Sequence, residues 1–323
     1  MTPETTRAGE YRAAGTGSAA AVAIGAAAAA QAGAENFPVA LRLLPRRYRR
    51  HLAAVYRFAR SADDMGDEAA PGQRLELLDE LEADIRRLYR KVRRAGSTDG
   101  TAGPGSALAG AGAEPDDASP RLPVVRELAR TVVSCAIPAQ PFLDLIEANR
   151  QDQVVTRYPA FADLLGYCQL SANPVGRIVL HVFGAATPER EALSDQVCTA
   201  LQLAEHWQDV AEDLRAGRVY LPLEDLDRFG VTEADLAAPQ AAPSVRALIA
   251  FEEHRARELL DAGAPIVGTL RGAARAAVAG YVAGGRAALA AIAASGHDPL
   301  SATPRPGRRR VAGELVRAYA TGR

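Results

Sequence analysis

The chain has 323 residues, a formal net charge of −1 and a hydrophobic fraction of 48%, much of it alanine. This charge balance gives no case for nucleic-acid binding, so we expect no nucleic-acid partner. The three cysteines, Cys135, Cys168 and Cys198, form no zinc or disulfide framework and fit reduced thiols in the cytoplasm.

The first 33 residues are rich in Ala, Gly and Thr, and we interpret residues 1–33 as a disordered leader. The alanine-rich run 18–34 is too weakly apolar for a transmembrane helix and lacks the regions of a signal peptide. We therefore expect a cytoplasmic protein. Peripheral contact with the inner face of the membrane stays open.

From residue 34 onward, apolar residues recur at helical spacing, and no alternating strand pattern with hairpin turns is visible. Prolines separate the helical segments. The predicted helices are 46–68, 73–94, 123–136, 141–153, 161–183, 189–216, 244–262 and 267–294.

Residues 95–121 consist mainly of Gly, Ala, Ser, Pro and Asp and have no periodicity. We interpret them as a flexible insertion within one domain, which we expect to span residues 34–297. The tail 298–323 carries a basic cluster, Arg308–Arg310, which we interpret as a solvated face, with a last short helix left open.

Two of the predicted helices carry acids at close spacing: Asp63, Asp64 and Asp67 in one, and Glu205, Asp209 and Asp213 in the other. Residues four apart on a helix share a face, so each set would repel itself unless a cation lies among its members. A solvated surface, or pairing with nearby arginines, could also explain them. The apolar neighbours of both sets favour the cation, because unpaired acids there would cost free energy.

All of these ligands are oxygen donors, which favours Mg²⁺ or Mn²⁺ and not zinc. Mg²⁺ held by a few carboxylates keeps positions for phosphate oxygens. Arg60, Arg218 and Tyr220 lie near the acids and could contact the same phosphates. No P-loop or GxGxxG precedes a helix. The residues alone therefore predict a helical protein that binds a diphosphate through Mg²⁺.

Three stretches resemble the squalene/phytoene synthase family, and the resemblance covers residues from about 35 to 294. The first acidic motif is YRFARSADDMGDE (56–68), the second is LQLAEHWQDVAEDLRAGRVYLP (201–222), and the central helix is RYPAFADLLGYCQLSANPVG (157–176). The resemblance implies a single all-α isoprenoid synthase bundle with a central cavity.

Three further features resemble the hydroxysqualene synthases of bacterial hopanoid biosynthesis: ENFPVALRLLP, the Trp-Gln before Asp209, and GRVYLPLEDLDRFG. This resemblance implies a lyase that converts presqualene diphosphate and water to hydroxysqualene and diphosphate with Mg²⁺. A prenyltransferase that makes presqualene diphosphate, squalene or phytoene stays open. So do a non-catalytic isoprenoid-binding protein and association with other squalene-pathway enzymes.

The resemblance also implies residue roles. It places Asp63, Asp64 and Asp67, and then Asp209 and Asp213, at the metal and diphosphate. Arg60, Arg218 and Tyr220 would contact the diphosphate, and Tyr56 would line the site. Glu205 stands where the family usually carries Asn, and we keep it as a metal ligand.

The aromatic candidates for stabilising a carbocation are Tyr56, Phe58, Phe161, Tyr167 and Trp207, of which Tyr167 is favoured. Core packing is the alternative for each of them. His181 and His206 are interpreted as ordinary helix residues and not as acid–base groups.

Overall fold

The computed structural model describes residues 44–97 and 119–323. In these residues the chain folds into helices, which confirms the predicted all-α class, and its one β-type pairing is an isolated bridge between Arg157 and Val219. The predicted leader 1–33, and most of the predicted insertion 95–121, lie outside the described residues. In chain order the helices are α3 (Arg46–Asp67), α4 (Arg74–Ser97), α5 (Pro123–Cys135), α6 (Gln140–Gln151), α7 (Phe161–Ser171), α8 (Asn173–Val182), α9 (Pro188–Gln208), α10 (Val210–Arg215), α11 (Leu223–Phe229), α12 (Glu233–Leu236), α13 (Pro243–Gly263), α14 (Ile266–Thr269), α15 (Gly272–Ala294) and α16 (Arg308–Thr321).

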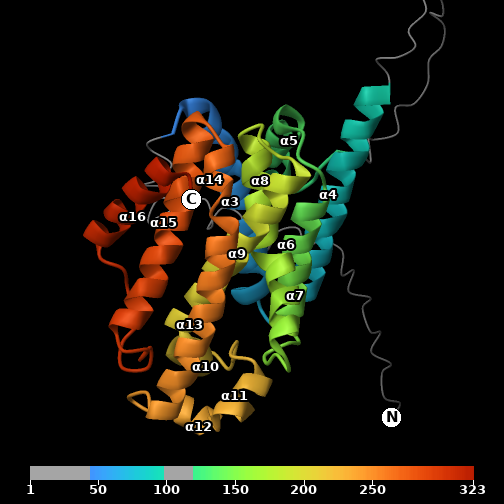
Figure 1. Cartoon of the computed structure of the whole chain (residues 1–323). Helices are drawn as coiled ribbons and strands as arrows, with labels where there is room; N and C mark the ends of the chain where they lie inside the picture. The colour runs from blue at the N-terminus through green and yellow to red at the C-terminus, as the bar shows by residue number, and fades with distance from the viewer. Residues whose placement is uncertain (1–43, 98–118) are drawn as a thin grey trace, which may run out of the picture.

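Helix α9 lies in the middle of the bundle and packs against α13, α8 and α15 (Figure 1). Helices α4 to α7 lie on one side of it, and α15 and α16 on the other. One apolar cluster joins α3, α4, α5 and α6 with α8, and a second joins α7, α9, α13 and α15. The core thus forms on both sides of the α8–α9 pair.

Three of the predicted helices are interrupted in the structure. Predicted helix 161–183 breaks at Ala172 because Pro174 has no N–H for a continuing helix and begins a new one instead. Predicted helix 189–216 breaks at Asp209, where φ is −104° and ψ is 15°. Predicted helix 267–294 breaks after α14, where Leu270 is extended with φ −101° and ψ 162°.

The tail 298–323 contains α16, which packs along α15. Helix α15 is the one helix of the described residues long and apolar enough to cross a membrane. Because α9, α13 and α16 cover it, we interpret α15 as a core helix. Two short helices that the periodicity did not predict, α11 and α12, follow the second acidic motif.

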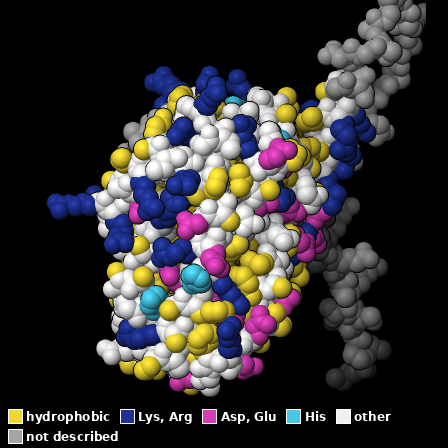
Figure 2. All heavy atoms as spheres, in the orientation of Figure 1, with side chains coloured by type: hydrophobic (Ala, Val, Ile, Leu, Met, Phe, Trp, Pro, Cys, Tyr) yellow, Lys and Arg dark blue, Asp and Glu magenta, His cyan; other side chains and the backbone are white. Residues whose placement is uncertain are grey.

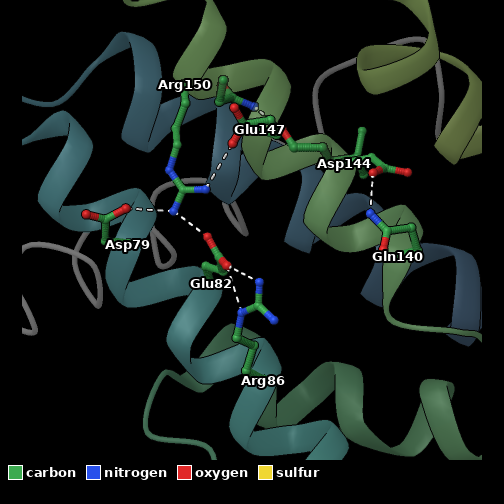
Figure 3. Close-up of polar contacts among 9 residues, drawn as sticks. Asp79, Glu82, Arg86, Gln140, Asp144, Glu147 and Arg150 are labelled. Atoms are coloured by element: carbon green, nitrogen blue, oxygen red, sulfur yellow. Dashed lines mark hydrogen bonds and ion pairs between the residues drawn. The ribbon is translucent and has the colours of Figure 1, made fainter.

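Two polar contacts fix α5 and α6 against α4. Buried Asp84 accepts hydrogen bonds from the backbone N–H groups of Arg121 and Leu122 at 2.8 to 2.9 Å, just before α5 begins. Arg150 of α6 lies 2.6 Å from both Asp79 and Glu82 of α4, as Figure 3 shows. Arg150 follows Asn149 directly, so this ion network also fixes the end of α6 that faces the acidic residues described next.

Candidate active site

The two acidic motifs meet through Arg218. Its Nη2 lies 2.9 Å from Oδ1 of Asp67 at the end of α3, although the two residues are 151 positions apart in the sequence. The charge of the same guanidinium opposes the rise that burial causes in the pKa values of Asp213 and Asp152, so Arg218 interacts with carboxylates from three segments. The predicted residues Asp67, Arg218 and Asp213 therefore come together around one cation.

One turn before Asp67, the Oδ1 atom of Asp63 accepts a hydrogen bond of 3.2 Å from Asn149 of α6. Part of the Asp63 side chain is exposed, yet the protein around its carboxyl desolvates it and raises its pKa to about 6. Repulsion from Asp67 raises the pKa further, while the Asn149 hydrogen bond opposes the rise. Gly66 passes so close that a Cβ there would lie 2.6 Å from the Asn149 oxygen. The approach of α3 to α6 is therefore part of the site.

The second motif crowds four carboxylates around the break between α9 and α10. Partial burial raises the pKa of Asp213 to about 7, and repulsion from Asp209, Glu212 and Glu205 adds to the shift. Burial also raises the pKa values of Asp209 and Glu205. Such mutual repulsion is relieved when a cation binds among the carboxylates.

The C-terminal segment adds a cation to this motif. Gln208 donates a hydrogen bond to the Pro304 carbonyl oxygen, and the charge of the neighbouring Arg305 opposes the rise in the pKa of Asp209. Nothing in the sequence connects residues 298–323 with the acids, because this contact joins distant parts of the chain.

No three His, Cys, Asp or Glu side chains of the described residues are grouped as a ready-made metal site. Mg²⁺ does not require such a group, because it usually binds one or two carboxylates and completes its shell with waters and phosphate oxygens. The separate oxygen donors Asp63 and Asp67, and Asp209 and Asp213, fit that mode of binding. Mg²⁺ itself stays a prediction.

Asp64 and Arg60 have different surroundings from the other predicted residues. The Asp64 side chain is 1% exposed, and the Nε atom of Arg60 lies 2.8 Å from its Oδ1. The Nη2 of Arg60 also lies 3.0 Å from Glu68. The roles predicted for these two residues at the metal and diphosphate stay predictions.

A cluster of aromatic rings lies beneath the acids. Tyr220 is buried and stacks on His206, with ring centroids 3.6 Å apart, and its ring is 5.9 Å from Tyr158 and 6.0 Å from Tyr167. Burial and the nearby Asp152 raise the pKa of Tyr220 to about 12. Of the predicted site residues, Tyr167 and Tyr220 thus lie together.

Tyr167 donates a 2.9 Å hydrogen bond to Oδ2 of Asp152, which follows α6. Burial raises the pKa of Asp152 to about 6, although the Tyr167 hydrogen bond and Arg218 oppose the rise. Asp152 was missed from the sequence, as was Asn149. Neither lies in a motif, and only the packing of α6 against α3 and α7 brings them to the site.

His206 was interpreted as an ordinary helix residue, but it connects the second motif to the interior. Its Nε2 lies 3.0 Å from Gln202 Nε2, and its Nδ1 lies 4.0 Å from Asp213 Oδ2. Burial lowers its pKa to about 3, so the ring is neutral at pH 7.

The other aromatic candidates mainly pack. Phe58 is fully buried against Phe142, with ring centroids 5.1 Å apart, and Trp207 is fully buried in the core. Phe161 lies under the Arg255 guanidinium at 4.4 Å. Tyr56 is half-buried on α3, one turn before Arg60.

A cavity of about 220 Å³ extends from the second motif into the bundle, which agrees with the predicted central cavity. Its wall is mainly apolar. On α9 it runs from Ser194 to Glu205, a length of about 16 Å at the helical rise. Gln202 and Glu205 line the end near the acids, while Ile266 and Val278 contribute apolar surface. A charged recognition site thus adjoins a mainly apolar cavity.

The chain is similar to several known proteins. A hydroxysqualene synthase from Rhodopseudomonas palustris is 33% identical over 240 residues, which cover 73% of this chain and 72% of that protein. A presqualene diphosphate synthase from the same organism is 34% identical over 215 residues, covering 65% and 67%. The crystal structure of squalene synthase HpnC from Alicyclobacillus acidocaldarius superposes with a TM-score of 0.71 at 38% identity, covering 86% of this chain and 95% of that one.

The model of the squalene/phytoene synthase family matches residues 30–313, which include both acidic motifs, the aromatic cluster and the cavity. The chain therefore belongs to the squalene/phytoene synthase family.

Proposed function

We propose that this protein converts presqualene diphosphate and water to hydroxysqualene and diphosphate, with Mg²⁺. The observation that carries the proposal is the junction of a carboxylate-rich, arginine-containing site with a mainly apolar cavity whose near end is polar at Gln202 and Glu205. The likeness to a protein named hydroxysqualene synthase supports the same reaction.

The first step is heterolysis of the bond between the cyclopropylcarbinyl carbon and the diphosphate oxygen, whose electron pair leaves with the diphosphate. Arg218 is placed to stabilise the charge on that leaving group once it turns from Asp67 toward the phosphate oxygens. Mg²⁺ would neutralise diphosphate charge while it is bound by Asp63, Asp67, Asp209 and Asp213.

The carbocation then rearranges beside the aromatic cluster, where the face of Tyr220 or Tyr167 can stabilise positive charge. Water attacks the rearranged cation. A new C–O bond forms, and the water proton passes to the diphosphate or to solvent. Gln202 lines the cavity and is held by His206, so it is well placed to orient that water.

A condensation of two prenyl diphosphates is the second candidate. It is supported by the 34% identity to a presqualene diphosphate synthase. Such a condensation would use a diphosphate site of the same kind but would join two substrates. A non-catalytic isoprenoid-binding protein is the third, and it would follow if the extra charge of Glu205 prevents productive metal binding.

The test is incubation of the purified protein with Mg²⁺ and either presqualene diphosphate or farnesyl diphosphate, without NADPH. Hydroxysqualene formed from presqualene diphosphate supports the proposal. A condensed product from farnesyl diphosphate, or from a C20 diphosphate in a parallel incubation, supports a prenyltransferase. Failure to release diphosphate from any of these substrates supports a binding protein. Omission of Mg²⁺ and addition of a chelator test the metal requirement in the same assay.

A further inference from the structure

The C-terminal helix α16 carries a concentration of exposed apolar side chains. Seven large apolar side chains of the described residues are exposed, and three of them lie on this 14-residue helix. They are Leu315 at 37%, Val316 at 69% and Tyr319 at 46% exposure. Scattered single exposures are normal, but a concentration on one helix indicates a contact surface.

The helix has two distinct faces. Ala318 is buried, and Val311 and Glu314 are half-buried, so this face packs on α15. Val316 lies on the opposite face, with Leu315 and Tyr319 on one flank of it, as their helical positions require. Val316 therefore points away from the bundle, while Leu315 and Tyr319 lie at the edge of the packed face and stay partly exposed.

Arginines surround this apolar face. Residues 305–323 contain six arginines and one glutamate, and Arg308–Arg310 form the first turn of α16. The Arg275 guanidinium of α15 lies 4.9 Å from the Tyr319 ring centre and adds a cation beside it. Figure 2 shows Lys and Arg side chains gathered over α16 and the adjoining part of α15.

We propose that α16 docks this protein on an anionic lipid bilayer, with Leu315, Val316 and Tyr319 inserted at the headgroup boundary and the arginines against lipid phosphates. An exposed apolar stripe bordered by arginines is the pattern of a helix that lies in the membrane interface. Basic residues near such a surface are attracted by anionic lipids. A second copy of the chain fits less well, because two α16 faces in contact would bring two arginine clusters together.

The position of α16 gives this surface a use. The helix begins four residues after Pro304, whose carbonyl oxygen accepts a hydrogen bond from Gln208 beside Asp209, and its other end packs on α14. At that end, Gly322 approaches Gly268, while Ile266 of the same short helix lines the cavity. Helix α16 thus packs on α14 and α15, and both of these helices contribute residues to the cavity wall. Docking there would keep the apolar cavity close to the membrane, whichever isoprenoid it holds, so this inference does not rest on the proposed reaction.

The test is co-flotation of the full chain with vesicles of phosphatidylcholine alone or mixed with phosphatidylglycerol. We expect binding to the anionic vesicles that weakens as salt is raised, because screening shortens the electrostatic range. Arg309→Glu with Arg310→Glu should reduce the partition by well over tenfold, since each arginine near an anionic surface contributes about fivefold.

Val316→Glu should reduce binding to anionic vesicles by about tenfold or more, because it places a charge in the inserted face. Val133→Glu on α5 is the matched control, since Val133 is 61% exposed and lies on a different helix. Circular dichroism melts confirm that each variant is folded. Equal binding to neutral and anionic vesicles, or unchanged binding of Val316→Glu, would overturn the proposal. A dimer in light scattering that Val316→Glu dissociates would overturn it in favour of a second copy of the chain.

Discussion

Asp63 and Asp64 are adjacent in the sequence but have opposite surroundings. Asp63 is partly exposed and bonds to Asn149, whereas Asp64 is buried and paired with Arg60. The sequence places both residues in one acidic motif but does not distinguish their roles. Adjacent residues on a helix point about 100° apart, and only the packing of the neighbouring helices decides which of the two directions is buried. Removing each acid should therefore change a different property.

We expect Asp63→Asn to lower turnover by about a hundredfold or more, because the metal and diphosphate lose a charged ligand, with little change in the free energy of unfolding. Asp64→Asn should instead lower the free energy of unfolding by about 3 kcal/mol, because it breaks a buried ion pair. Diphosphate release and urea denaturation measure the two effects. Loss of turnover without loss of stability in Asp64→Asn would restore Asp64 to the metal ligands.

Tyr167 and Asp152 form a second residue-scale unit through their 2.9 Å hydrogen bond. If they act together, Tyr167→Phe and Asp152→Asn should each reduce kcat, by about tenfold or more, and the double variant should be hardly worse than either single one. Steady-state kinetics on the four proteins gives the coupling free energy. Fully additive losses would show that the two side chains act independently. Tyr89→Phe is the control. The Tyr89 hydroxyl lies outside the site and donates hydrogen bonds of 2.7 Å and 2.9 Å to two backbone carbonyl oxygens.

At the scale of elements, helix positions could be read from the sequence better than helix continuity. The break before Pro174 had a local signal, because proline cannot continue a helix. The sequence signal for the break at Asp209 was weaker. Aspartate favours helix ends, but the apolar pattern continues on both sides of Asp209. This break matters for the site, because Glu205, Asp209 and Asp213 lie on two helices and not on one continuous stripe.

Helices α11 and α13 are joined by buried charges that predict how stability depends on pH. Glu252 is fully buried, and Arg255 lies 3.3 Å from it and 2.6 Å from Asp225. Burial, with the hydrogen bond to Asp225, raises the pKa of Glu252 from 4.5 to about 8. A raised pKa in the folded state means that folding favours the protonated acid, so this stabilisation is complete below about pH 4.5 and is lost as pH rises toward 8.

Between pH 5 and pH 8 the free energy of unfolding should therefore fall less for Glu252→Gln than for the parent protein. The difference should reach up to a few kcal/mol, since one pKa unit corresponds to about 1.4 kcal/mol. Urea denaturation across this pH range measures the free energy of unfolding of both proteins. Glu258→Gln is the matched control on the same helix, because that side chain is 68% exposed. Parallel pH profiles for the parent and Glu252→Gln would show that Glu252 stays ionised in the fold.

At the scale of the whole molecule, the sequence predicted the two acidic walls but not what lies between them. The Asp67–Arg218 contact joins residues 151 positions apart, and His206, Asn149 and Asp152 enter the site only when α3, α6, α7 and α9 pack. Local periodicity reports which face of a helix is buried, but not which distant helix covers it. The motifs therefore identified the charged end of the site together with Tyr167 and Tyr220, while Asn149, Asp152 and the nearby C-terminal segment required the fold.

The charged site and the apolar cavity are lined largely by different residues. Binding of the diphosphate and accommodation of the isoprenoid chain should therefore respond to different mutations. Val278 lines the cavity on α15 and belongs to none of the charged motifs. Val278→Trp should fill part of the 220 Å³ cavity and lower kcat/KM for a long prenyl diphosphate by about tenfold or more, because apolar pockets discriminate strongly by size. Binding of Mg²⁺ with inorganic diphosphate, measured by calorimetry, should not change. Val133→Trp on the surface of α5 controls for the added ring, and a thermal melt checks the fold. If Val278→Trp weakened the binding of inorganic diphosphate as much as turnover, the charged site and the cavity would not be separable as the structure implies.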